Sequence, residues 1–227
     1  MTNVLEEVSP LELYYYSLSR YCQKVLIALY EKQVEFSPKV TDLRDPIVRR
    51  RFLKKFPMGQ LPIIKTNDKK HLPNASIIVE YLDKTFDTGT QLISLDPVKR
   101  LDIKLHDRLI DSEINNRLFR MDNIHDSDLP LPNHLQIKRE ENQITNLLND
   151  LDEKLEKNHW LCGDTFSMAD CALIPCLRHP WMQTHLKYFE NLHRYKLQAE
   201  TRGAWMLVID EIKLAEAEDF IGLNQIP

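Results

Sequence analysis

The sequence predicts an α/β domain followed by an all-helical domain. Strand-like and helix-like segments alternate over residues 1–86, whereas only long helical patterns are found over residues 97–227. Alternation of this kind is typical of an α/β domain, and a run of amphipathic helices is typical of a bundle. The linker is predicted at residues 87–96, where the texture changes. The chain has 227 residues, 43% of them hydrophobic, which is enough for two cores.

The first strand and helix are predicted by a change of periodicity near residue 20. The aromatic-rich run "LELYYY" at 11–16 is short and suits a buried strand. From Tyr21 the apolar residues recur at helical spacing, which predicts a helix over 21–33. The stretch between them, "SLSR", is where α/β proteins often place reactive groups.

The remaining elements of the first domain follow from alternation and turn signals. The segment 34–40 alternates and contains a proline, so we expect a strand at a sheet edge. Residues 46–56 predict an amphipathic helix with a basic, solvated face. Segments 61–65 and 69–72 predict a hairpin, and 74–86 predicts a helix. The predicted order is therefore β-α-β-α-β-β-α.

Composition excludes several classes of function. The formal net charge is −4, so we expect no nucleic-acid partner. No apolar run approaches the roughly 20 residues of a membrane-spanning helix, and the N-terminus has no signal-like pattern. We therefore expect no membrane association and a cytoplasmic location. The four cysteines are too few for a disulfide scaffold, and no histidine stands at ligand spacing from both Cys171 and Cys176, so no metal site is expected.

Two separated motifs stand out. In "FPMGQLPII", Pro62 opens a predicted strand, where a trans proline would be ordinary. In "LCGDTFSMADCAL", Ser167 and Asp170 have the spacing of a capping box at a helix start, with Phe166 placed to pack beside it. The second motif predicts a role in folding rather than in catalysis.

Together, the element order and both motifs resemble the cytosolic glutathione transferases. The first motif is similar to that family's Asn-Pro-x-Gly-x-Val-Pro segment, and the second to the start of the core helix of its C-terminal domain. The resemblance implies a thioredoxin-like N-terminal domain and a cis bond before Pro62. It also implies that Gln60, Leu61 and Pro62 hold the peptide backbone of glutathione, the co-substrate.

The resemblance implies an enzyme that adds the sulfur of glutathione to a small electrophile, and a homodimer. Ser19 falls where the theta-like and zeta-like members keep a catalytic serine. A hydroxyl donor and the positive end of the following helix would stabilise a thiolate, which is the nucleophilic form of a thiol. Ser19 is equally suited to cap that helix. Tyr16 and Cys22 are the alternative reactive groups, although strand packing and core packing explain them more simply.

The sequence departs from the family at the start of the predicted helix 74–86. The resemblance implies Glu-Ser or Gln-Ser here, gripping the γ-glutamyl carboxylate, but this chain has Asn74 and Ala75. Ser76 would face about 100° away on a regular helix. Asn74 can still cap the helix, whose free N–H groups can hold a carboxylate. Losing the hydroxyl is expected to weaken glutathione binding by roughly one to two decades.

This departure leaves a second functional hypothesis open. The segment "FSMADCALIPCL" also resembles stringent starvation protein A, a transferase-fold protein that binds RNA polymerase and lacks the transferase activity. The pair Asn74 and Ala75 fits such a non-catalytic protein, whereas Ser19 fits the enzyme. A thiol transferase based on Cys22 fits poorly, because the leading catalytic position holds a serine.

Overall fold

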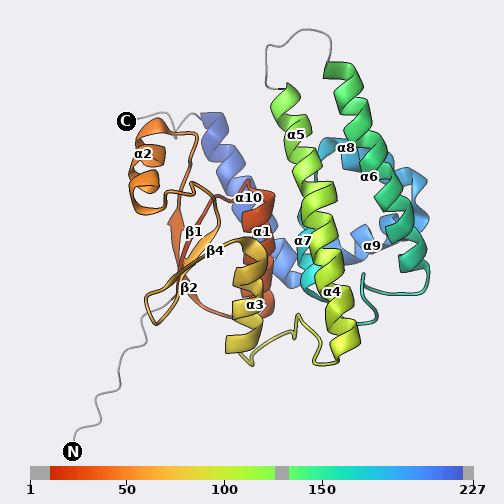
Figure 1. Ribbon diagram of the computed structural model, residues 1–227, viewed down its shortest axis with the longest axis horizontal. Helices are drawn as coiled ribbons and strands as arrows, with labels where there is room; N and C mark the ends of the chain where they lie inside the picture. The colour runs from red at the N-terminus through yellow and green to blue at the C-terminus, as the bar shows by residue number, and fades with distance from the viewer. Residues whose placement is uncertain (1–10, 126–132, 222–227) are drawn as a thin grey trace, which may run out of the picture.

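The computed structural model describes residues 11–125 and 133–221, and its N-terminal half has the predicted β-α-β-α-β-β-α order (Figure 1). The elements are β1 (Leu11–Tyr15), α1 (Arg20–Glu31), β2 (Phe36–Val40), α2 (Pro46–Lys55), β3 (Ile63–Lys65), β4 (His71–Pro73) and α3 (Ala75–Thr85). They form one four-stranded sheet in the order β2-β1-β3-β4. The strand at 36–40 lies at the sheet edge, as its proline predicts, and is parallel to β1, while β3 and β4 run antiparallel to their neighbours.

The rest of the described chain is helical, which confirms the predicted fold class. The elements are α4 (Pro97–Leu109), a π-helical segment (Ile110–Asn115), α5 (Asn116–His125), α6 (Asn133–Glu156), α7 (Met168–Cys176), α8 (Pro180–His185), a 3₁₀ turn (Leu186–Tyr188), α9 (Glu190–Glu200) and α10 (Gly203–Ile221). None of the helices in the described ranges is long and apolar enough to cross a membrane.

A continuous apolar core joins the two halves through α1. The stretch Val25–Leu29 of α1 is completely buried, since this helix packs against α3 on one side and against α7 and α10 on the other (Figure 1). Helix α1 also lies directly after the end of β1, because its N-cap, Ser19, is four residues past the strand. The first turn of α1 is therefore held firmly at the junction between the sheet and the helical half.

The connection between the halves is pinned by backbone contacts. The Asp83 carboxylate accepts hydrogen bonds from the N–H groups of Leu92 (2.8 Å) and Ile93 (3.1 Å). Gly89 has φ +64°, and a Cβ on it would lie 2.0 Å from the carbonyl oxygen of Glu31, so only glycine fits this close approach. These contacts fix the segment between α3 and α4 against the C-terminal end of α1.

Asp170 closes the capping box predicted at the start of α7. Its carboxylate accepts hydrogen bonds from the Ser167 N–H (2.8 Å) and the Leu161 N–H (3.0 Å), and from the hydroxyls of Ser167 (2.8 Å) and Tyr195 (3.0 Å). Asp170 is completely buried, so these four donors are what makes its burial tolerable. Cys171 and Cys176 on this helix are buried packing residues, as predicted.

Candidate active site

Three chain segments that the sequence analysis singles out leave the sheet at the same end. Tyr14 near the end of β1 lies opposite Ile63 at the start of β3, and Ile63 lies opposite Pro73 at the end of β4. The loop after β1, the residues just before β3 and the start of α3 are therefore neighbours in space. This register brings the segments that contain Ser19, Gln60–Pro62 and Asn74–Ala75 together at one end of the sheet.

Ser19 is the N-cap residue of α1, but its side chain does not cap the helix. Its backbone is extended (φ −82°, ψ 121°), its N–H donates to the Tyr16 carbonyl (2.9 Å), and its carbonyl accepts from the Gln23 N–H (2.9 Å). No hydrogen bond runs from an N–H of the first turn to the Ser19 hydroxyl. The side chain is partly exposed at the positive end of a 12-residue helix with no acidic residue in its first turn. This is a position where an anion is stabilised.

Cys22 lies next to Ser19 but is a core residue. Its thiol is completely buried and lies 3.4 Å from the Tyr16 N–H. Burial raises the pKa of Cys22 to about 11, and the Tyr16 N–H and the Ser19 side chain only partly offset this. A thiol in this state is protonated at neutral pH and is not a nucleophile.

Tyr16 is the other alternative to Ser19 as the reactive group, and its hydroxyl already has hydrogen-bond partners. It donates to the Asp219 carboxylate of α10 (3.2 Å) and accepts a hydrogen bond from Arg44. Burial and the nearby acidic groups raise the pKa of Tyr16. The hydroxyl is therefore directed towards α10 and the residues before α2.

The two cations near Ser19 are bound to acidic residues of the helical half. Arg20 donates to Asn115 Oδ1 (2.8 Å) and Asp122 Oδ2 (2.9 Å). Lys24 is only 1% exposed, and its ammonium contacts Asp107 (2.6 Å), Asp111 (2.8 Å) and the Ser76 hydroxyl. These ion pairs fix the N-terminal half of α1 against α4 and the π-helical segment.

The Leu61–Pro62 peptide bond is cis, as the family resemblance implies. Pro62 is buried, Leu61 is partly exposed and Gln60 is exposed. Leu61 makes no backbone hydrogen bond to any group within residues 11–125 and 133–221. Its N–H and carbonyl are therefore available to an extended ligand that lies across this end of the sheet.

Asn74 caps α3 with its side chain, in a left-handed backbone conformation (φ 76°). Its Oδ1 accepts from the Ser76 N–H (3.0 Å) and the Ile77 N–H (3.3 Å). Ala75 is buried and offers no donor beyond its N–H. Ser76 points away, as helical geometry predicts, and its hydroxyl donates to Asp107 (2.7 Å) in the buried cluster with Lys24. No serine replaces the missing hydroxyl at this helix start.

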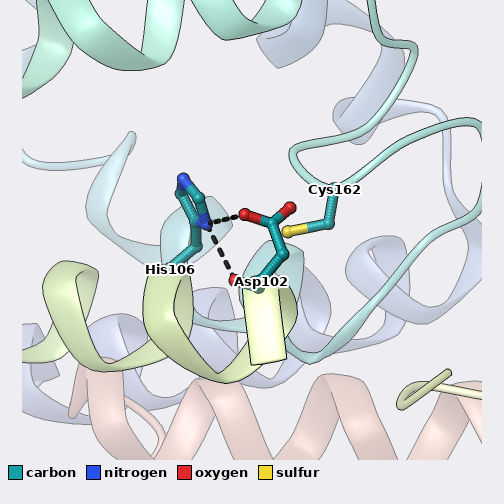
Figure 2. A group of neighbouring side chains, drawn as sticks. All are labelled: Asp102, His106 and Cys162. Atoms are coloured by element: carbon teal, nitrogen blue, oxygen red, sulfur yellow. Dashed lines mark hydrogen bonds and ion pairs between the residues drawn. The ribbon is translucent and has the colours of Figure 1, made fainter. Parts of the chain in front are cut away.

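A group with metal-ligand chemistry, not predicted from the sequence, lies elsewhere. Asp102, His106 and Cys162 offer ligand atoms within 4.8 Å of one another (Figure 2). His106 Nδ1 lies 2.8 Å from the Asp102 carbonyl oxygen and 3.1 Å from its carboxylate, which also binds the Lys154 ammonium (2.9 Å). Burial raises the pKa of the Cys162 thiol. The Lys154 ammonium already binds the Asp102 carboxylate that a metal ion would need. These residues therefore form a polar contact between α4, α6 and the loop before α7.

Family comparisons agree with this architecture. A model of the glutathione S-transferase N-terminal domain matches residues 13–90, and one of the C-terminal domain matches residues 132–198. The chain belongs to the cytosolic glutathione transferase superfamily. Its homologues are glutathione S-transferases, enzymes that use glutathione as co-substrate.

The chain is similar to plant glutathione transferases of the F group. Glutathione S-transferase F11 of Arabidopsis thaliana is 27% identical over 206 residues, which are 83% of this chain and 92% of that protein. Poplar glutathione transferase F1 has a solved structure with 25% identity and a TM-score of 0.78, covering 90% of this chain and 99% of that one. A glutathione-bound transferase from Methylobacillus flagellatus has a TM-score of 0.80 at 22% identity, with 87% and 98% covered, which shows the shared fold.

Proposed function

We propose that the protein is a glutathione transferase in which Ser19 activates the thiol of glutathione for attack on a small electrophile. The observation that carries the proposal is the position of the Ser19 hydroxyl, partly exposed at the N-terminus of α1 and unused as a helix cap. A hydroxyl donor at a helix N-terminus favours the thiolate form of a bound thiol.

Glutathione would lie across the end of the sheet where the loop after β1, the residues before β3 and the start of α3 meet. The free backbone groups of Leu61 next to Pro62 would pair with the tripeptide, with Gln60 beside them. The Ala75 N–H and the positive end of α3 would hold the γ-glutamyl carboxylate, since the Ser76 and Ile77 N–H groups already donate to Asn74. In this arrangement the sulfur would be directed towards Ser19 and the helical half, where the electrophile would bind.

Retention on immobilised glutathione, followed by a conjugation assay with 1-chloro-2,4-dinitrobenzene, tests the proposal. We expect retention by the wild type and by Ser19→Ala, and a loss of about 100-fold in kcat/KM for Ser19→Ala. Ser37→Ala, on β2, is the matched control and should leave the rate unchanged. Full activity of Ser19→Ala would contradict the assignment of Ser19.

A non-catalytic protein-binding role is the alternative, and the missing hydroxyl at Ala75 favours it. In that case the wild type would not be retained at millimolar glutathione. Absence of retention would therefore contradict the proposal that the protein is a glutathione transferase. Retention with full activity of Ser19→Ala would contradict only the assignment of Ser19 as the catalytic residue.

We also propose that the protein is a homodimer. Helix α4 exposes an apolar stripe of Val98 (78% exposed), Leu101 (70%) and Leu105 (51%), at the spacing of one helix face. Met58, in the loop between α2 and β3, is 71% exposed. An exposed apolar stripe such as the one on α4 is typical of a protein interface.

A further inference from the structure

A cavity of about 830 Å³ lies between β2, the C-terminal half of α1, and α10. In the sheet order β2-β1-β3-β4, β2 and β3 lie on opposite sides of β1. The cavity is therefore on the other side of β1 from Leu61, Pro62 and the start of α3. None of the proposed glutathione-site residues lines it. Its volume is in the range of about 300–1,000 Å³ that is typical of small-molecule sites.

The walls of the cavity are apolar and aromatic. The Phe36 ring packs against those of Tyr15 (centroids 6.4 Å apart) and Tyr30 (6.2 Å), so three aromatic side chains line one region. At least two large apolar side chains on the lining are unusually open to solvent, namely Leu214 (63% exposed) on α10 and Val40 (65%) on β2. Such surface is energetically unfavourable in water and is stabilised by a covering ligand.

One carboxylate is held in place inside this apolar wall. Glu211 of α10 accepts a hydrogen bond from the Tyr15 hydroxyl at one oxygen (2.8 Å) and from the Tyr30 hydroxyl at the other. The two donors come from β1 and α1, so three elements fix the orientation of one charge. A carboxylate oxygen can accept more than one hydrogen bond, which leaves Glu211 able to bind a further donor.

The charged residues that line the cavity are all acidic. Its charged lining residues are Glu35, Asp42, Glu211 and Glu218, and no lysine or arginine lines it among the described residues. The nearby Arg44 is bound to the carboxylates of Asp42 (2.7 Å) and Asp219 (2.8 Å). The field inside the cavity therefore favours a cation and disfavours an anion.

We propose that this cavity is a second binding site, for an organic cation with an aromatic or otherwise apolar body. The apolar part would cover Leu214 and Val40 and pack on the three aromatic rings. The positively charged donor would bind Glu211 and gain attraction from the ring faces. This inference is independent of the glutathione site, because the two sites share none of the residues that carry either proposal.

The test uses 9-aminoacridine, a fluorescent cation at neutral pH, and acridine-9-carboxylate, an anion with the same ring system. We expect saturable one-to-one binding of the cation to the full chain. The anion and Glu211→Gln, which keeps the size and accepting oxygen of the side chain, should each weaken binding at least about tenfold. Leu214→Arg, at an exposed position, should weaken it as well by adding a competing charge.

Controls separate this site from the active site. Ser19→Ala and saturating glutathione should leave 9-aminoacridine binding unchanged, and Glu211→Gln should keep wild-type thermal stability and conjugation rate. Absence of saturable binding, equal affinity for the anion, displacement by glutathione, or unchanged affinity in both Glu211→Gln and Leu214→Arg would each overturn the proposal.

Discussion

At the residue scale, the proposed binding of glutathione depends on Ala75. The carboxylate of a bound γ-glutamyl group would meet the Ala75 N–H at the start of α3 but no hydroxyl. Ala75→Ser adds one charge-assisted hydrogen bond, which contributes about 1.5–3 kcal/mol. We predict that it lowers the Kd for glutathione by roughly ten- to a hundredfold, measured by calorimetry.

Ala75→Gly is the control for this change, because it alters the size of the side chain without adding a donor. It should not strengthen glutathione binding. If Ala75→Ser binds glutathione no better than the wild type, the carboxylate does not lie at the start of α3.

Sequence alone could identify single residues only where local geometry decides their role. Ser19 is an N-cap residue because strand and helix meet there, and Asn74 caps α3 for the same reason. The burial of Lys24 was beyond local reasoning, since its partner Asp111 is 87 residues away in the chain. The direction of the Tyr16 hydroxyl is likewise set by α10, 203 residues further on.

At the scale of elements, the start of α3 depends on Asn74 in two ways. Its side chain accepts two hydrogen bonds from the first turn, and its backbone is left-handed at φ 76°. Asn74→Ala loses the cap, and alanine tolerates a positive φ less well than asparagine, so we predict a loss of about 2 kcal/mol in the free energy of unfolding.

Asn74→Gly separates the two effects in the same urea-unfolding experiment. Glycine adopts the left-handed conformation freely and costs only a few tenths of a kcal/mol at an N-cap, so it should destabilise much less than alanine. Equal losses for both variants would mean that backbone conformation does not matter at this position.

The order of strands and helices was predictable because each element has its own periodicity. The strand at β2 was even placed at an edge, since its proline cannot take part in a central ladder. The π-helical segment 110–115 was not predictable, because its sequence continues the helical pattern of α4. The packing of α10 against α1 is a tertiary contact that local sequence patterns do not predict. The cavity containing Glu211 depends on this packing.

For the whole molecule, two ion pairs of α1 join the two halves into one unit. Lys24 with Asp107 and Arg20 with Asp122 connect the first helix to the helical half beside the proposed site. Removing Lys24 would leave the buried Asp107 carboxylate without its ammonium, which is strongly unfavourable. The site geometry therefore depends on contacts across the domain boundary.

The exposed stripe on α4 leads to a prediction about assembly. Leu101 is 70% exposed between Val98 and Leu105, so a charge there would be desolvated if the stripe is an interface. We predict that the wild type sediments at about twice its 26.8 kDa chain mass and that Leu101→Arg sediments as a monomer. Leu197→Arg, at a 51% exposed leucine on α9, should remain dimeric. A monomeric wild type, or a Leu101→Arg variant that stays dimeric, would show that α4 does not form the interface.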